Sequence, residues 1–488
     1  MPEPQLAVYV PISAVFSDIK PDFKTLRSLL QSLSRTEALF WCARLNLVLS
    51  DLTIAAIERQ KFCMERFLSP EEIKRAFAFA QKEESAEKRV IVFFRGQLLE
   101  LMRWVALYCQ DLPGDGETFN EPEVRCRFSQ AALICSDISR TAVWGTDSVD
   151  ATALSLLQGN APDLSRKATE ATATTDLFVC LGRGLTLFQD YLPKYYSSFD
   201  EEFRCSTGLS IKQYFACFSM VLADSGRPAD EAGFPCRTVL QRTPYKDVFQ
   251  QYMALESQTP EELRRRLLHK FPKDLGSLEE APPYNKRPLL DRPILRTEGG
   301  RAIILDPLFF GESAIAGPLF HVLRTHNSKA RALFGAFGYA FQDYVNEILR
   351  RMFPTSAMLA DRLLTKEIIV EYGGSELEVD ACINDVEKVV LFETKAVWMQ
   401  EEKVLTDDHE VYMAHLRGKY VAPKGAGQLA RMICALSDPR QSKANDKFRG
   451  AKLIYPVMIV HDRFVPTPFL GRFLRPEFEA CLKPDDVL

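Results

Sequence analysis

The chain has 488 residues, of which 47% are hydrophobic and 26% are charged. This composition is typical of a folded globular protein and argues against a disordered one, and the length suggests two or three domains. The formal net charge of −4 excludes a globally basic nucleic-acid-binding protein, so any such binding would use local basic patches.

The N-terminal segment lacks a basic stretch followed by an unbroken apolar run, so we expect no signal peptide. Apolar stretches such as 90–94 are too short for a membrane span, which predicts a cytoplasmic protein with no membrane partner. The 12 cysteines include no C-x-x-C pair, which favours buried thiols over a disulfide framework or a zinc site. His409 and His415 have no cysteine partners nearby and are interpreted as surface residues.

The first 275 residues are predicted to be mainly helical. Ser34 and Glu37 have the spacing of a capping box, and Ser69 is followed by Pro70 and two glutamates, which is typical of a helix start. Apolar residues then recur at helical spacing over 87–108 and over 209–222.

Two segments of this region, 111–121 and 159–175, are rich in Gly, Pro or small polar residues and are predicted loops. We find no internal repeat, and no Gly-rich phosphate loop is followed by Lys and Ser or Thr, which argues against an NTPase.

A domain boundary is predicted where prolines become frequent and periodicity stops. We expect a helical region over 1–275 with a regulatory, sensor or partner-binding role, a linker over 276–292, and a second domain over 293–488. Residues 293–305 have the pattern of a β-hairpin with a turn at 298–300.

The second domain is predicted to be an α/β domain with a central mixed sheet flanked by helices. Its expected elements, in chain order, are a helix over 330–351, strands over 366–372, 376–383 and 388–395, a helix over 425–436 and a strand over 452–460. In the first of these helices the apolar residues are expected to cover one broad face.

Two acids and a lysine are the candidate chemical groups. Asp380 is on the second predicted strand, and Glu393 and Lys395 share one face of the third. A turn at 384–385 would make these strands antiparallel neighbours and bring the three side chains together. Because two nearby carboxylates repel and burying a charge is costly, the group favours a divalent cation such as Mg²⁺, which prefers oxygen ligands.

These residues carry a resemblance to a known family. ELEVD, twelve residues and ETK resemble the Asp…Glu-x-Lys core of the PD-(D/E)XK nuclease superfamily, which has the restriction-endonuclease-like fold. The preceding FGYAFQDYVNEILRRMF is similar to its first helix, KGAGQLARMI is similar to the helix after its core, and PILRTEGGRAIILDP is similar to a hairpin of some members. The resemblance covers roughly residues 285–460.

The resemblance implies a residue for each role. Asp380, Glu393 and the carbonyl of Thr394 would bind Mg²⁺ or Mn²⁺, Lys395 would be the catalytic lysine, and Gln428 would contact the scissile phosphate or water. The usual glutamate of the first helix falls on Gln342, which departs from the pattern and implies one well-held metal ion. Asp343 and Glu347 are the other acids of this helix that could fill that role, and Glu378 is interpreted as a solvated neighbour rather than a ligand.

Three further features stay open. The insertion over 396–422, with Trp398, Tyr412 and Tyr420, could be a substrate clamp or plain surface. Basic residues that could bind a phosphate backbone fall into two sets. The first set is more typical of a solvated helix face, and the second is expected near Asp380, Glu393 and Lys395. The first set is Arg264, Arg265, Arg266, His269, Lys270 and Lys273, and the second is Lys424, Lys443, Lys447, Arg449 and Lys452.

The leading hypothesis is a metal-dependent nuclease that hydrolyses phosphodiester bonds of DNA, with RNA as the second substrate. Fusion of such a nuclease to a large helical region resembles bacterial effectors of anti-phage defence, an analogy at the level of the fold. The alternatives are a catalytically weak nuclease-fold module that binds nucleic acid or a protein partner, and a purely structural interaction protein. A protein partner of the helical region and an oligomeric state stay open.

Overall fold

The structure, a computed structural model, divides into two compact units. Unit 1 comprises Met1–Leu185 and Glu201–Val322, and unit 2 comprises Thr186–Asp200 and Leu323–Leu488. The structure describes residues 7–482 except 52–53, 83–88, 112–118, 120, 145–172, 226–233, 236–244, 270–286, 298–300, 354–361, 366–368, 373–374, 386, 399–408, 422–424, 438–447, 449–450 and 462–466.

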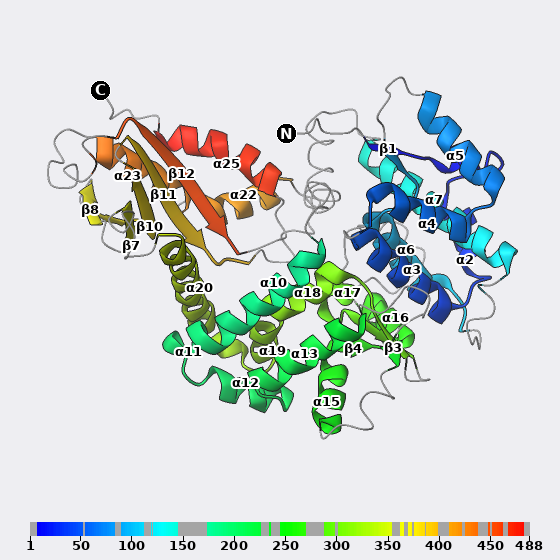
Figure 1. The fold of residues 1–488 in the computed structure, drawn as a ribbon, viewed down its shortest axis with the longest axis horizontal. Helices are drawn as coiled ribbons and strands as arrows, with labels where there is room; N and C mark the ends of the chain where they lie inside the picture. Colours follow the sequence, from blue (N-terminus) through cyan, green and yellow to red (C-terminus); the bar gives the residue numbers. More distant parts are fainter. Residues whose placement is uncertain are drawn as a thin grey trace. The chain divides into compact units, whose positions relative to one another are not determined.

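Unit 1 is mainly helical (Figure 1). Its helices are α1 (Ile12–Val15), α2 (Phe23–Leu30), α3 (Arg35–Ser50), α4 (Ala56–Phe67), α5 (Pro70–Lys82), α6 (Arg95–Tyr108), α7 (Pro122–Trp144), α10 (Ala173–Thr186), α12 (Phe199–Thr207), α13 (Ile211–Ser225), α15 (Lys246–Glu256), α16 (Pro260–His269), α17 (Arg287–Asp291), α18 (Pro307–Ile315) and α19 (Gly317–Thr325). Its strands are β1 (Ala7–Tyr9), β2 (Arg89–Ile91), β3 (Phe234–Pro235), β4 (Ser257–Gln258), β5 (Ile294–Arg296) and β6 (Arg301–Ile304).

Helix starts in unit 1 only partly follow the predicted caps. At α5 the Ser69 hydroxyl accepts from the Glu72 N–H at 3.3 Å, and Glu72 accepts from the Ser69 N–H at 2.6 Å, which makes a complete capping box. At α3 the prediction of a box at Ser34 is wrong, because the Ser34 side chain makes no cap hydrogen bond. The chain there is held by a backbone bridge to Gln110 instead.

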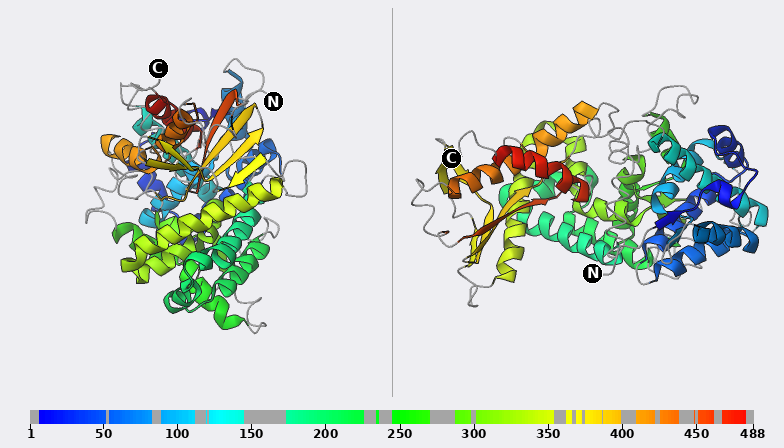
Figure 2. Two further views of the ribbon diagram at one scale, coloured as in Figure 1. Left: turned by 90° about the vertical axis from the view of Figure 1, so that its left-hand side faces the viewer. Right: turned by 90° about the horizontal axis from the view of Figure 1, so that it is seen from above.

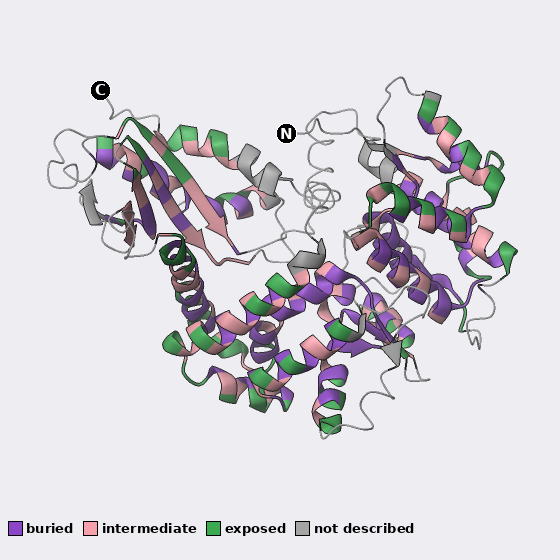
Figure 3. Ribbon diagram, viewed as in Figure 1, coloured by how far each residue is buried: buried purple, intermediate pink, exposed green. Residues whose placement is uncertain are grey.

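Helix α6 is the centre of the N-terminal core. All of its residues from Gly96 to Tyr108 are buried, and it packs against α3 and α7 (Figure 3). The helix predicted over 87–108 begins too early, because the first part of this range forms β2, which pairs in parallel with β1. The run of β-branched residues Val90, Ile91 and Val92 explains why this stretch is extended.

The predicted hairpin over 293–305 is present, but it belongs to unit 1. Strand β5 pairs with β6 in the antiparallel sense, and they form a four-stranded sheet of order β3-β6-β5-β4. Residues 293–322 are therefore counted with unit 1, which differs from the expected domain start at 293. The turn at 298–300 and most of the expected linker over 276–292 lie outside the described residues, but α17 occupies 287–291.

A buried ion pair connects α6 to the start of α18. Arg95 donates to both carboxylate oxygens of Asp306, at 2.5 and 2.6 Å. The Asp306 side chain is completely buried, and it also caps α18 by accepting from the Phe309 N–H at 3.0 Å. Removal of the carboxylate would thus leave both a buried cation and a helix N–H without this acceptor.

We expect Asp306→Ala to lower the free energy of unfolding by about 3–5 kcal/mol, the usual result of breaking a buried ion pair. The measurement is urea unfolding followed by tryptophan fluorescence, which reports mainly on unit 1 because Trp41, Trp104 and Trp144 lie there. The control is Glu65→Ala in the exposed pair with Lys61, where a loss of at most about 0.5 kcal/mol is expected. A similar small loss for both variants would contradict this role of Asp306.

Unit 2 combines helices with a small mixed sheet (Figure 1). Its helices are the π-helix η4 (Leu187–Tyr191), α11 (Leu192–Tyr195), the 3₁₀-helix η6 (Asn327–Lys329), α20 (Ala330–Met352), α22 (His409–Tyr420), α23 (Ala426–Ser437) and α25 (Thr467–Leu482). Its strands are β7 (Leu363–Thr365), β8 (Ile369–Tyr372), β9 (Ser375–Glu378), β10 (Ala381–Asp385), β11 (Lys388–Lys395) and β12 (Leu453–Val460).

The main sheet of unit 2 has the order β12-β11-β10-β7. Strand β11 pairs in parallel with β12 and antiparallel to β10, so the sheet is mixed as expected. Leu391 of β11 packs with Leu429 of α23 and Phe478 of α25, which places these two helices on the same side of the sheet (Figure 2). The sheet thus has one face covered by helices.

The strand limits need correction. The expected strand over 376–383 is two strands, since β9 forms a hairpin with β8 while β10 pairs with β11 and β7. The break falls at Val379 and Asp380, so Asp380 is at a bend and not within a strand. Asn384 and Asp385 are in β10, where they pair with Val389 and Lys388, so the turn is not at these two residues as expected.

The predicted helices over 330–351 and 425–436 correspond to α20 and α23. The apolar face of α20 is narrower than expected, because Phe337, Phe341 and Leu349 are buried whereas Ile348 is exposed. The expected loops at 111–121 and 159–175 lie mostly outside the described residues.

The chain is therefore a mainly helical protein with small mixed sheets in its C-terminal half and a helical N-terminal region. Among the described residues, no helix is both long enough and apolar enough to cross a membrane.

Candidate functional site

Helix α20 contributes Gln342 to the candidate site. The Gln342 amide donates to Asp380 Oδ1 at 2.5 Å, so the helix position that departs from the family pattern does face the candidate acid. Asp343, one residue on, instead accepts from the Tyr195 hydroxyl, and Glu347 pairs with Arg351 at 3.3 Å. Of the three side chains considered on this helix, Gln342 is thus the one that reaches Asp380.

Asp380 is fixed by the end of β11. The backbone N–H of Thr394 donates to Asp380 Oδ2 at 2.6 Å. The pairing of β10 with β11 starts at Ala381 and Phe392, so the bend at Asp380 lies beside the part of β11 that holds Glu393. The bend between β9 and β10 therefore brings the first candidate carboxylate beside the second.

Glu393 and Lys395 lie two residues apart on β11 and form an ion pair with each other. Glu393 is only 2% exposed, and the Lys395 side chain is 11% exposed. Both residues continue the face on which Leu391 packs against α23, because alternate residues of a strand share a face. A charged pair is thus held at the edge of an apolar core.

Burial raises the pKa of Asp380 above its ordinary value of 3.8, and the nearby Glu378 carboxylate acts in the same direction. The Thr394 N–H and the Lys395 ammonium group lower this pKa and offset part of the effect. The native state therefore bears a free-energy cost for holding Asp380 ionised.

We expect Asp380→Asn to be more stable than the parent chain at pH 7, because the amide carries no charge to bury. A pKa raised in the native state means that ionisation destabilises the fold, so the advantage of the variant should grow as the pH rises above 3.8. Thermal unfolding midpoints of both proteins between pH 4 and 8 measure this difference. An advantage that shrinks as the pH rises would contradict the assignment.

Gln428 supports the main chain next to Asp380. Its amide donates to the Glu378 carbonyl at 2.7 Å, so it holds the end of β9 and is not bonded to the Asp380 carboxylate. Gly425 begins the turn into α23 with a φ of +83°, and a Cβ there would lie 2.3 Å from the Tyr420 carbonyl oxygen. The glycine before this helix is thus a steric requirement. Glu378 is exposed, which agrees with its interpretation as a solvated neighbour.

His461 is a residue of this region that the sequence reasoning missed. Its backbone N–H donates to the Lys395 carbonyl at 2.9 Å, and its ring meets Phe337, Phe341 and Trp398 edge-on, with centroids 4.9, 5.1 and 5.0 Å away. It is only 3% exposed. The sequence signal that could have found His461 is its position directly after β12. Because β11 and β12 are parallel, their C-terminal ends meet at the same edge of the sheet.

The insertion over 396–422 is partly a packing element. Trp398 contacts Phe337 as well as His461, and Tyr420 at the end of α22 is fully buried. Both aromatic residues therefore have a packing role in unit 2. Residues 399–408 and the Tyr412 side chain lie outside the described residues.

The expectation that Lys452 lies near the site is wrong. Lys452 pairs with Glu387 just before β11 and β12 begin, whereas Glu393 and Lys395 are at the other end of β11. Eight strand residues separate the two ends by roughly 20 Å. The other members of that basic set, Lys424, Lys443, Lys447 and Arg449, lie outside the described residues.

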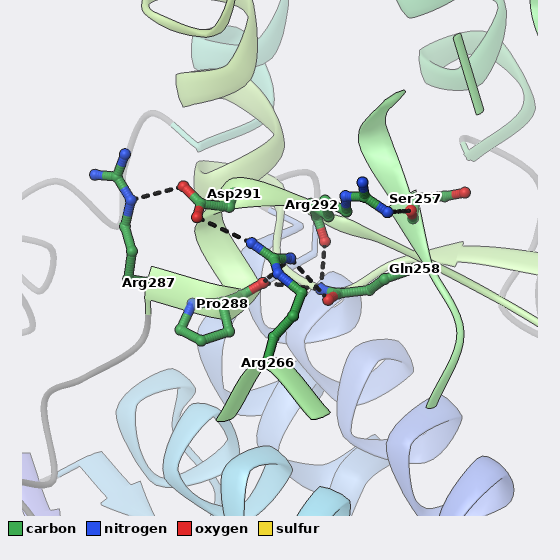
Figure 4. A network of polar contacts seen from close by, with 7 residues as sticks. All are labelled: Ser257, Gln258, Arg266, Arg287, Pro288, Asp291 and Arg292. Carbon is green, nitrogen blue, oxygen red and sulfur yellow. Dashed lines mark hydrogen bonds and ion pairs between the residues drawn. The ribbon is translucent and has the colours of Figure 1, made fainter. Parts of the chain in front are cut away.

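Arg266, from the basic run on α16, is held in a polar network within unit 1 (Figure 4). It donates to Gln258 Oε1 at 2.9 Å, to the Pro288 carbonyl at 3.1 Å and to Asp291 at 2.9 Å. These contacts join α16 to β4 and α17, which favours a structural role over phosphate binding. Lys270 and Lys273 lie outside the described residues.

We expect Arg266→Ala to lower the free energy of unfolding of unit 1 by about 2 kcal/mol, because three charge-assisted hydrogen bonds are lost. Arg265→Ala, on the exposed side of the same helix, should change it by at most about 0.5 kcal/mol. Urea unfolding of the two variants makes the comparison. A loss of oligonucleotide affinity in Arg266→Ala without loss of stability would support the phosphate-binding role instead.

Comparison with protein-family models, curated proteins and solved structures finds no match to this chain. Within the part of the chain that the structure describes, no group of three or more His, Cys, Asp or Glu side chains is placed to hold a metal ion. The candidate site differs from such a group, because its oxygen donors are two carboxylates, one backbone carbonyl and one side-chain amide.

Proposed function

We propose that unit 2 is a magnesium-dependent nuclease domain of the restriction-endonuclease-like type. The observation that supports this most is at one end of β11. The Thr394 N–H and Gln342 hold Asp380 there, Lys395 pairs with Glu393, and the Lys395 charge also acts on Asp380. The mixed sheet with α23 on one face and α20 carrying the Gln342 position agrees with the same proposal.

The donor set suits a hard divalent cation. The side chains of Asp380 and Glu393 and the carbonyl of Thr394 would hold Mg²⁺, with Mn²⁺ as a substitute. Each oxygen of Asp380 accepts one hydrogen bond, from Gln342 or from Thr394, and a carboxylate oxygen has a second lone pair available for a ligand. Glu393 would exchange part of its contact with Lys395 for the ion.

When bound, Mg²⁺ would polarise the phosphodiester and lower the pKa of a water molecule. Lys395 would orient the attacking water and stabilise negative charge that develops on the phosphate oxygens. Asp380 is held ionised at neutral pH only at a cost, so it gains most from a positive charge next to it. Gln342 and Thr394 would fix the rotamer of Asp380 through their hydrogen bonds.

The proposed substrate is DNA, and RNA is the alternative substrate to be tested beside it. Unit 1 is proposed to regulate the nuclease or to bind a protein partner, as in effectors of anti-phage defence, an argument from analogy of architecture. Because Thr186–Asp200 belongs to unit 2, deletion of residues 1–275 would remove part of the proposed nuclease, so regulation is tested on the full chain.

A second candidate is a nuclease-fold module that binds nucleic acid but cleaves slowly. It is favoured by Gln342, because a neutral amide holds a second metal ion less well than the usual glutamate does. Gln342→Glu separates the two candidates. A module that cleaves slowly because of Gln342 should cleave faster as Gln342→Glu, whereas the proposed nuclease with one metal ion should cleave no faster than the parent chain.

The full chain should cleave plasmid, linear or single-stranded DNA, or RNA, with Mg²⁺ or Mn²⁺ and not with EDTA. Lys395→Ala should reduce the rate at least about 100-fold, because it removes a proton-transfer and charge-stabilising group. The matched control is Lys452→Ala, at the opposite end of the same strand pair, which should leave the rate unchanged. A chain that binds nucleic acid without cleaving it, or a Lys395→Ala rate equal to the parent rate, would overturn the nuclease proposal.

A further inference from the structure

Unit 2 carries a surface of tyrosines next to the candidate site. We call the side chains of Tyr191, Tyr195, Tyr339 and Tyr344, together with Lys194, the tyrosine surface. Tyr195 and Tyr339 stack at a centroid distance of 5.5 Å and an interplanar angle of 28°, although they are 37% and 59% exposed. Exposed stacked aromatic rings contribute little to a core, which suggests a ligand for them.

The chain before α11 has an unusual shape that presents these rings. The N–H of Leu192 bonds to the Leu187 carbonyl, five residues back, which makes η4 a π-helical turn. Pro193 follows directly and has no N–H to continue an α-helical ladder. π-Helical turns are rare and occur mostly at functional positions.

The orientation of the rings is fixed by neighbouring groups. Tyr195 donates to the Asp343 carboxylate on α20. Burial, together with this bond, raises the pKa of Tyr195 to about 12, so the hydroxyl stays protonated and keeps donating. Lys194 lies over the Tyr191 ring, with its Nζ 4.3 Å from the centroid, and Tyr191 meets Tyr344 edge-on at 6.0 Å.

The tyrosine surface continues into the candidate site. Tyr339 lies one helical turn before Gln342, and Gln342 bonds Asp380, so an occupant of Tyr339 is within reach of the proposed catalytic group. Close to Tyr339, a Cβ on Gly335 or Gly338 would meet no atom within 4 Å, so the helix surface there is open. The charges next to these rings are mixed, since Asp190, Asp343 and Glu347 act on Tyr191 together with Arg351, and Lys194 lies over its ring. Stacking on the rings, rather than net charge, would therefore carry the binding.

From this geometry we infer that the tyrosine surface binds single-stranded nucleic acid by stacking its bases on Tyr195 and Tyr339, and leads the strand to the site at Asp380. Stacking on aromatic rings is tolerant of base sequence, because every base has a π face. The inference rests on the proposed nuclease function for its purpose, but the binding itself does not need cleavage. Bases in a duplex are already stacked on each other, so intact double strands gain nothing from these rings.

The test measures binding in EDTA, where no cleavage occurs. Fluorescence anisotropy of a labelled single-stranded oligodeoxynucleotide, of the matching oligoribonucleotide and of the DNA duplex is compared at fixed salt. Tyr339→Ala and the double variant with Tyr195→Ala should weaken single-strand binding about tenfold or more. Tyr339→Phe, which keeps the ring, and Tyr455→Ala, an exposed tyrosine on β12, should bind as the parent does.

The two single-stranded oligonucleotides show which sugar is accepted, and either one binding through Tyr339 supports the inference. Equal single-strand affinities of parent and Tyr339→Ala, an equal loss for duplex, or no single-strand binding would overturn it. Thermal unfolding of each variant checks the fold, and Tyr339→Leu replaces Tyr339→Ala if the latter is unstable. If the chain binds single strands through Tyr339 but never cleaves them, the nuclease proposal is wrong and this inference stands. If the chain cleaves but Tyr339→Ala changes neither binding nor cleavage, this inference is wrong and the nuclease proposal stands.

Discussion

Two carboxylates and one ammonium group lie at one end of β11, where the Thr394 N–H holds Asp380 and Lys395 pairs with Glu393. Glu393 is nearly inaccessible, and burial raises the pKa of Asp380. Lys395 pairs with Glu393, and its ammonium group also lowers the pKa of Asp380. Such an arrangement stabilises a fold poorly, because desolvated charges cost several kcal/mol each unless they are fully paired. We therefore propose that the function of this group supplies further positive charge, as the divalent cation of the proposed site would.

The rest of unit 2 can be understood as the frame of this group. The bend at Asp380 ends β9 and starts β10, so one strand-like stretch serves two sheets. Gln428 holds the carbonyl before the bend, Thr394 holds the carboxylate after it, and His461 bonds the end of β11. Each contact ties one neighbouring element to the same strand end, which limits movement of the charged side chains.

The sequence predicted α20, α23, β11 and β12 well, because each has a long and strongly periodic apolar pattern. Resemblance singled out Gln342 as the counterpart of the usual first-helix glutamate, and the structure brings Gln342 to Asp380. Elements that depend on distant contacts were not predicted. The break at Asp380 follows from pairing with two different strands, and the pairing of Ser34 with Gln110 replaces an expected cap.

The association of the hairpin β5–β6 with unit 1, and of Thr186–Asp200 with unit 2, likewise depends on tertiary contacts. Local periodicity carries no information on such exchanges between units. For the same reason, the position of Lys452 could not be predicted. Lys452 lies at the end of β11 and β12 opposite to Lys395, and this follows only from the parallel pairing of the two strands. Short-range chemistry was therefore more predictable than long-range placement.

Asp380, Glu393 and the Thr394 carbonyl are proposed to form a site for one divalent cation. Diffraction from crystals grown with Mn²⁺, recorded at the manganese absorption edge, tests this site most directly. We predict one anomalous peak about 2.0–2.3 Å from oxygens of these three residues. Crystals that show no peak there, with Asp380 and Glu393 still bonded as they are without the ion, would contradict it.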